Sequence, residues 1–418
     1  MKALHLGTSP HYTIRPWLMG VSLTARFLLA GTFLFSGFVK AVDPMGMVYK
    51  LAAYLAAWGV EAGADSLLLQ VAAVALATLE FMLGIYWLLG VRRRLTLMLT
   101  TLFMLVMTAL TIYIYVYAPV PDCGCFGDAV VLSNGATLAK NGVLLGACIW
   151  LHLLPTRALR FISERNQWIT SVFSLLYAVA LSLWSLHYLP PIDFTDFKRG
   201  ADIRAHYGGE LPEGVTPARD LVSMALFDTE GNDVTPDVLD FGGYTFLLVL
   251  SDPRTADDGS NDRINDLADY ARDHGYRFYC LTCGPADDIE GWTDRSGANY
   301  AFLQADQTSL EAMVRSNPGL LLLHDGRLLD KWGNNNLPEW LTAAPLPQYY
   351  PEQGRKDKLP AQKKIFSPQK FSLLRPFAKV LAWFVFPLLG VVFLDRLWTG
   401  WQWNKRKRLY NSLKQQPL

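Results

Sequence analysis

Residues 67–89 read LLLQVAAVALATLEFMLGIYWLL, an apolar run in which Glu80 is the one charged side chain. A helix needs about 20 apolar residues, each rising about 1.5 Å along the axis, to cross the hydrocarbon core of a bilayer. The run meets that length, so it predicts a membrane-spanning helix.

Five other runs of similar apolarity lie on either side of it. They cover residues 18–38, 95–117, 137–154, 169–188 and 377–397. Of the 418 residues, 51% are hydrophobic and 18% are charged, and apolar residues gathered in blocks are typical of an integral membrane protein. The formal net charge of +1 gives no electrostatic basis for binding nucleic acid. The expected surroundings are therefore a lipid bilayer.

The basic residues predict how the spans are oriented. Clusters follow the second, fourth and sixth runs: Arg92, Arg93 and Arg94; Arg157, Arg160 and Arg165; Lys405, Arg406, Lys407 and Arg408. All fall on one side if the N-terminus is cytoplasmic. No small-residue cleavage site follows a short apolar core, so the first span is expected to be retained. This predicts a multi-pass protein of a bacterial inner (cytoplasmic) membrane, with both termini cytoplasmic and the large insert at 190–376 in the periplasm.

The connection between the first two spans, residues 39–66, would also lie outside. Its sequence MVYKLAAYLAAWGV predicts an amphipathic helix at the membrane surface. Tyr49, Tyr54 and Trp58 suit the level of the lipid headgroups.

The stretch PVPDCGCFGDAV, residues 119–130, follows the third span and places Cys123 and Cys125 one residue apart. A disulfide across a single glycine closes a small ring away from the preferred geometry, so it would be strained and easily reduced. Thiols can be oxidised in the periplasm, and a strained, exposed disulfide is more often a redox element than a structural one. Two alternatives stay open: inert, packed cysteines, and a metal site, although no histidine lies nearby to complete a zinc set.

Two further stretches accompany the cysteine stretch DCGCFGDA at 122–129: FLFSGFVKAVDPMG at 33–46 and LEFMLGIYWLLG at 79–90. Together they resemble the DoxX-like and MauE-type membrane proteins over about residues 19–154, a four-helix unit. The MauE family is associated with methylamine utilisation, where it assists maturation and disulfide formation of a periplasmic dehydrogenase. The resemblance implies that Cys123 and Cys125 are the matching functional pair. The additional domain and two additional spans depart from the four-helix pattern, so a methylamine substrate is not expected here.

The insert is α/β in character. From residue 244 onward it predicts the order β-α-β-α-β-α-β-β-α, with Pro318 entering a final hairpin that turns at Asp325-Gly326. Over about residues 245–343 this order resembles the thioredoxin fold, which places a cis-proline at the position of Pro318, beside its active site. The complete chain resembles DoxX-type proteins with a fused C-terminal domain, as found in Bacteroidetes.

The cysteines of the insert do not occupy the thioredoxin positions. Thioredoxin-type redox pairs follow the first central strand, where a helix N-terminus lowers the pKa of a thiol. Here that segment reads SDPRTADDGSND and contains no cysteine. Cys280 and Cys283 instead end a strand, so we expect Cys280 in the core and Cys283 half-exposed near Pro318. Cys148 is expected to be a small residue buried in the fourth span.

The predicted fold class is an α-helical membrane bundle, a four-helix DoxX/MauE-like unit plus two further transmembrane helices, with an inserted thioredoxin-like α/β domain. The predicted boundaries are 1–155 for the four-helix membrane domain, 156–190 for the fifth span, 191–343 for the periplasmic domain, 344–376 for a Pro- and Lys-rich linker, and 377–418 for the sixth span with a basic cytoplasmic tail.

Charged residues inside the spans need partners, because each is costly in lipid. Arg26 lies about 12 Å and Glu80 about 15 Å from the inner ends of their spans, so the two are expected to pair. The sequence identifies no cofactor, but such a pair could orient a membrane quinone or another small redox partner. The alternative is a buried ion pair that only holds two helices together. Lys40 and Asp43 are expected at the outer end as an interfacial pair or a helix-terminus contact, with Lys40 reaching toward the surface.

Two functions compete. The first is a thiol–disulfide redox or maturation factor that acts on periplasmic client proteins through Cys123 and Cys125. The second is a non-enzymatic, membrane-anchored assembly module that uses a redox-inactive thioredoxin-like domain. No phosphate-binding loop, haem motif, metal-ligand spacing or Ser-His-Asp arrangement is recognisable, and a transporter lacks support because no inverted repeat or broken helix is visible. The sequence leaves both interpretations open, and with them the question whether the protein is an enzyme.

Overall fold

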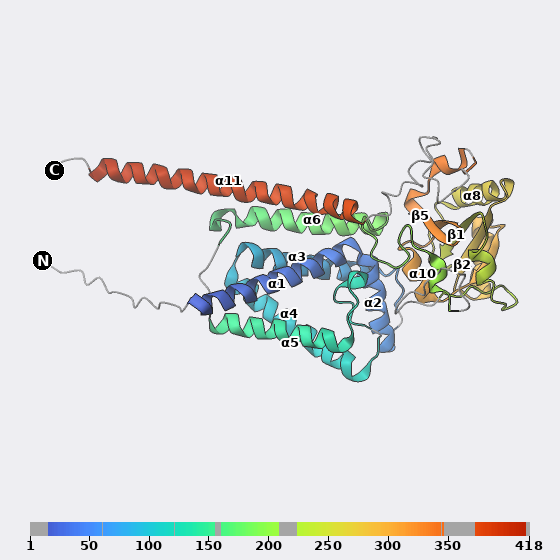
Figure 1. The fold of residues 1–418 in the computed structure, drawn as a ribbon, viewed down its shortest axis with the longest axis horizontal. Coiled ribbons are helices and arrows are strands. Elements are labelled where there is room, and N and C mark those ends of the chain that lie inside the picture. The colour runs from blue at the N-terminus through green and yellow to red at the C-terminus, as the bar shows by residue number, and fades with distance from the viewer. Residues whose placement is uncertain are drawn as a thin grey trace.

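The computed structural model describes residues 16–60, 62–120, 122–154, 160–208, 224–343, 345–346 and 373–414. A bundle of long helices lies at one end and an α/β domain at the other (Figure 1). Residues 1–15 and most of the predicted linker at 344–376 lie outside the described residues.

Among the described residues, six helices are long and apolar enough to cross a membrane. They are α1 (Pro16–Val42), α3 (Leu67–Leu89), α4 (Arg93–Tyr117), α5 (Asn134–Leu153), α6 (Gln167–His187) and α11 (Leu374–Lys414). Each coincides with one of the six apolar runs, so the prediction of a helical membrane bundle is confirmed at this level.

Two glycines allow α1 and α3 to cross with their backbones almost in contact. A Cβ on Gly37 would lie 2.2 Å from the backbone nitrogen of Phe81, and one on Gly84 would lie 2.4 Å from that of Leu34. Small residues permit such close approach between membrane helices. The crossing fixes the register of the pair, because Gly37 stands level with Phe81 and Leu34 stands level with Gly84.

The short helix α2 (Pro44–Ala57) lies across the end of the bundle nearest the α/β domain (Figure 1). Asp43 caps it by accepting a 2.9 Å hydrogen bond from the backbone nitrogen of Gly46, and Pro44 suits its first turn. The predicted helix is therefore present. Trp58 is 56% exposed, whereas Tyr54 is buried because it packs against the cysteine-bearing loop.

Helix α11 is longer than the predicted sixth span. Its 41 residues extend over about 60 Å, so the basic residues Lys405 to Arg408 stand on a continuing helix and not on a separate tail. Helix α11 runs beside α6 (Figure 1). Asp395 anchors it there, because its carboxylate accepts hydrogen bonds from the backbone nitrogen of Ser163 (2.8 Å) and from the side chain of Asn166 (2.7 Å).

The α/β domain is built on a five-stranded mixed sheet. Its strands are β1 (Tyr244–Leu250), β2 (Arg277–Thr282), β3 (Ala301–Gln304), β4 (Gly319–His324) and β5 (Arg327–Gly333), in the order β3-β2-β1-β4-β5. The first three are parallel, and β4 is antiparallel to both of its neighbours. The central strand β1 is buried along its whole length, as expected for a strand covered on both faces.

From residue 244 onward, the helices α8 (Asn261–Asp273), α9 (Ala286–Ser296) and α10 (Gln307–Met313) follow the predicted order. A short helix that was not predicted, α7 (Thr235–Leu239), precedes β1. The last predicted helix is instead a 3-10 segment, η5 (Glu339–Ala343). Cys280 is fully buried in the core, as predicted, and the Asn317–Pro318 peptide bond is cis. These observations confirm an α/β domain, while its thioredoxin-like identity stays a prediction.

Candidate functional site

The two closely spaced cysteines lie in the Cys loop, residues 122–130, which links α4 to α5 at the end of the bundle that faces the α/β domain. Both are free thiols, and their sulfur atoms are 2.9 Å apart. Gly124, between them, adopts a φ of +64°, in the left-handed region that favours glycine. The sequence suggested an exposed pair, but Cys123 and Cys125 are only 5% and 9% exposed because the loop folds back onto α2.

Helix α2 holds the first half of the Cys loop. The amine of Lys50 lies 2.6 Å from the carboxylate of Asp122, which also accepts a 2.7 Å hydrogen bond from the backbone nitrogen of Gly124. The Tyr54 hydroxyl donates to the carbonyl oxygen of Cys123 at 3.2 Å. These contacts fix the backbone on both sides of the first cysteine.

A buried polar cluster from α1 and α3 holds the second cysteine. The amine of Lys40 lies 2.8 Å from the carboxylate of Glu80 and donates to the Ser36 hydroxyl at 2.7 Å and to the Cys125 carbonyl oxygen at 2.6 Å. Ser36 donates to Glu80 at 2.6 Å. The side chains of Lys40 and Glu80 are each 3% exposed, so this ion pair is buried directly beneath the Cys loop.

The predicted Arg26–Glu80 pair is wrong. Arg26 donates from Nε to the carbonyl oxygen of Trp87 (2.7 Å) and from Nη2 to that of Leu88 (2.9 Å), and so satisfies carbonyl groups that the end of α3 leaves without helical donors. The predicted pair assumed that α1 and α3 have their inner ends at the same depth in the membrane. The expectation that Lys40 reaches the surface is also wrong, because Glu80 holds it inside. Whether Arg26 and Glu80 bind a cofactor stays a prediction.

A sequence signal for the correct partner existed. Ser36 and Lys40 are four residues apart, so they share one face of α1, and Gly37 between them marks the face that approaches another helix. Glu80 lies next to Phe81, the residue that Gly37 meets. Asp43 does not pair with Lys40 either; it caps α2 and meets an arginine of the α/β domain, Arg315.

The surroundings of Cys125 favour its thiolate. A hydrogen bond shared by the two sulfur atoms and the nearby amines of Lys140 and Lys40 lower the pKa of Cys125 to about 6, against the opposing effects of burial and of the Glu80 charge. The same hydrogen bond, with burial, raises the pKa of Cys123. A cavity of about 30 Å³ adjoins Cys125, Lys40 and Lys140, enough for about one water molecule. The surroundings therefore favour a thiolate on Cys125 and a neutral thiol on Cys123.

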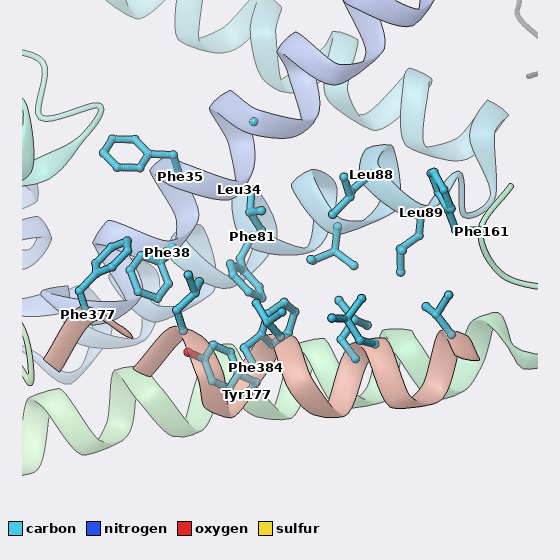
Figure 2. A pocket seen from close by; sticks show the side chains of 17 residues that line it. Leu34, Phe35, Phe38, Phe81, Leu88, Leu89, Phe161, Tyr177, Phe377 and Phe384 are labelled. Carbon is cyan, nitrogen blue, oxygen red and sulfur yellow. The ribbon is translucent and has the colours of Figure 1, made fainter. Parts of the chain in front are cut away.

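A second, larger cavity of about 410 Å³ lies between α1, α3, α6 and α11. Figure 2 shows that aromatic and aliphatic side chains line it, among them Phe38, Phe81 and Phe384. The Tyr177 hydroxyl donates to the carbonyl oxygen of Val380 at 2.8 Å, so the walls present mainly carbon. Neither Arg26 nor Glu80 belongs to this lining.

The α/β domain shows no second reactive pair in the part of the chain that the structure describes. The Cys283 thiol is half-buried and donates to the carbonyl oxygen of Ser251 at 3.0 Å, while Cys280 is buried in the core. Cys148 is buried in α5, as predicted. Across the described residues, no group of three or more His, Cys, Asp or Glu side chains could hold a metal ion.

The part of the chain that carries Cys123 and Cys125 is similar to a known protein family. Residues 18–154 match the family of the methylamine utilisation protein MauE. This MauE-like unit, residues 18–154, comprises nearly all of α1 to α5 and the Cys loop, whereas α6, the α/β domain and α11 lie outside it. No curated protein and no solved structure matches the chain. The likeness agrees with the resemblance seen in the sequence over the same helices.

Proposed function

We propose that the protein performs thiol–disulfide exchange on periplasmic client proteins, with Cys123 and Cys125 as the exchanging pair. The observation that carries the proposal is the contact between their sulfur atoms, 2.9 Å apart, beside two lysines that favour a thiolate on Cys125. Under this proposal the chain is an inner-membrane maturation factor with cytoplasmic termini, and the α/β domain is its thioredoxin-like periplasmic part.

The exchange needs only two reactants, the oxidised Cys123–Cys125 pair and two thiols of the client. A client thiolate attacks the sulfur of Cys123 in the oxidised pair, the bond to Cys125 breaks, and Cys125 leaves as the thiolate because its pKa is the lower. A second client thiolate then attacks the client sulfur of the mixed disulfide, which forms the client's disulfide and releases Cys123. Two electrons pass to the pair; one client proton remains on Cys123 and the other enters solvent.

Turnover in this direction requires an electron acceptor. A membrane quinone, when bound, would take two electrons and two protons and so restore the oxidised pair. The 410 Å³ cavity has the carbon lining that suits an isoprenoid chain, but its one hydroxyl, on Tyr177, is already bonded to Val380. The cavity therefore supports binding of the tail, and the ring would need polar partners elsewhere.

Alkylation trapping in intact cells tests the proposal. A membrane-impermeant maleimide should label Cys123 or Cys125 after reduction, without breaking the cells open. Cys123→Ser and Cys125→Ser should each increase the fraction of reduced thiols in periplasmic proteins, whereas the matched control Cys148→Ser should not. Unchanged client thiols in both loop variants would defeat the proposal.

A second candidate function is a non-enzymatic assembly module. It is favoured by the α/β domain, whose Cys280 is fully buried and whose segment after β1 contains no cysteine. Capture of the same periplasmic partners by the full-length wild type and by the Cys123→Ser/Cys125→Ser variant, with no change in client thiols, would favour this function over exchange.

A further inference from the structure

One arginine of the α/β domain extends into the helical bundle. Arg315 lies between α10 and β4, and its Nε is 3.0 Å and 3.2 Å from the two carboxylate oxygens of Asp43. Its Nη2 donates to the carboxylate of Asp128. The Arg315 side chain is 6% exposed and that of Asp43 is 9% exposed, whereas that of Asp128 is 32% exposed. The Arg315–Asp43 pair is therefore buried, and the Arg315–Asp128 pair lies at the edge of the contact.

The surroundings of the guanidinium are shaped to hold it. Its Nη1 donates to the carbonyl oxygen of Glu311, and the Tyr49 ring lies 5.4 Å from its central carbon, within cation–π range. A Cβ on Gly46 would lie 2.7 Å from an Asp43 oxygen and 3.2 Å from Arg315 Nη2. Two carboxylates, a carbonyl and an aromatic face therefore engage one arginine.

Asp128 connects this contact to the cysteines. It follows Cys125 by three residues, in the short 3-10 turn Gly127–Ala129. The Cys loop is thus held at both ends from different parts of the chain: Lys50 of α2 binds Asp122, and Arg315 of the α/β domain binds Asp128. The Arg315 side chain is 6% exposed and that of Asp128 is 32% exposed, so solvent screens this pair only in part. Loss of Arg315 therefore leaves the Asp128 carboxylate without its cation and removes the contact that holds this end of the loop.

We propose that Arg315 is a positioning residue through which the docked α/β domain holds the Cys loop in its reactive geometry. In that geometry Cys125 is surrounded by Cys123, Lys40 of α1, Glu80 of α3 and Lys140 of α5. When the domain is released, Asp128 loses its cation and the loop relaxes away from these groups. The domain then regulates the thiols without contributing one. The link to reactivity rests on the proposed function, but the geometric claim is testable without any client.

The experiment compares full-length Arg315→Ala, Arg315→Lys and Asp128→Asn with the wild type, in detergent or nanodiscs. Asp128→Asn matters most, because it removes the loop-side charge while leaving the Arg315–Asp43 contact that docks the domain. The matched control is Arg254→Ala, since the Arg254 side chain is 69% exposed and its ion pairs stay within the α/β domain.

Two readouts are used, both resolved by mass spectrometry. The first is amide hydrogen exchange across residues 122–130, and the second is the pH midpoint of alkylation of the Cys125 peptide. We expect exchange to become at least tenfold faster and the midpoint to rise by one pH unit or more in Arg315→Ala and Asp128→Asn. Arg315→Lys should fall in between, because it keeps the charge and loses the forked contact. Arg254→Ala should match the wild type.

An Asp128→Asn variant with wild-type exchange and a wild-type midpoint would overturn the proposal, even if Arg315→Ala failed to fold. That failure is distinguishable from failure of the proposed function. Unchanged client thiols in Cys123→Ser and Cys125→Ser would defeat exchange chemistry and leave the loop measurements intact.

Discussion

The buried Lys40–Glu80 pair makes the sharpest energetic prediction. Lys40→Met removes the cation and leaves the Glu80 carboxylate, 3% exposed, without a counter-charge beneath the Cys loop. It also removes the hydrogen bonds from Lys40 to Ser36 and to the Cys125 carbonyl oxygen. Breaking a buried pair by removing one partner costs about 3–5 kcal/mol, so the free energy of unfolding should fall by that amount.

The Lys50–Asp122 pair supplies a matched control on the same loop. Its charged atoms are 2.6 Å apart, but its side chains are 24% and 19% exposed. Solvent screens such a pair, and exposed pairs contribute about 0–1 kcal/mol. Lys50→Met should therefore cost far less than Lys40→Met, although the two pairs have similar lengths and the two substitutions remove the same atoms.

Equilibrium unfolding in mixed detergent, followed by tryptophan fluorescence, measures both losses. The double variant Lys40→Met/Glu80→Gln should recover at least half of the loss, because it no longer buries a lone charge. Equal losses in Lys40→Met and Lys50→Met would refute the reasoning, since burial is the property that separates the two pairs. A double variant as unstable as the single one would refute it as well.

Three further predictions follow from single contacts. Gly84→Ala should lower the free energy of unfolding by about 1–3 kcal/mol, because its Cβ would lie 2.4 Å from the backbone nitrogen of Leu34. The control Gly31→Ala should be neutral in the same unfolding assay, because no atom lies within 4 Å of the added Cβ. Alkylation of Cys125 should rise through about pH 6 and then level off, since the thiolate forms above its lowered pKa; a rate that still climbs at pH 8 would contradict this. Asp395→Ala should lower the free energy of unfolding by about 1–3 kcal/mol, because it removes the acceptor for Ser163 and Asn166. Amide exchange at the start of α6 should then become faster. Unchanged exchange there would contradict the role of Asp395 as an anchor.

The spans and the order of the α/β domain were predictable because each follows from a local rule. Lipid offers no hydrogen-bond partners to backbone N–H and C=O groups, so an apolar run long enough to span the bilayer has to be helical. The strand-and-helix alternation of the insert appears in the sequence as changes of hydrophobic period, and the hairpin turn appears as Asp325-Gly326. The last predicted helix is the 3-10 segment at Glu339–Ala343, a short terminal piece where such periodicity carries little information.

The charge partners inside the bundle depended on register, which no local rule supplies. Depth counted from the ends of the runs placed Arg26 level with Glu80. The glycine contacts give a different register for α1 and α3, because Leu34 stands level with Gly84. Arg26, eight residues before Leu34 on α1, then lies level with the end of α3 and not with Glu80. Lys40 thereby becomes the partner of Glu80. The spacing of Ser36, Gly37 and Lys40 is consistent with this register. The register can be predicted from that spacing only if it is known which helix packs against α1.

The contact between the two units was beyond sequence reasoning for a different reason. Arg315 and Asp43 are separated by 272 positions, and an arginine before a strand predicts nothing about a membrane helix. Once the units dock, Asp43 and Asp128 both turn their carboxylates to the same guanidinium. Without that cation, the buried Asp43 carboxylate would lie near the partly exposed carboxylate of Asp128 with no positive charge between them, a costly arrangement for the buried group. The MauE-like unit of this chain therefore depends electrostatically on the α/β domain inserted after it, and the carboxylate that carries the dependence belongs to the loop that carries the thiols.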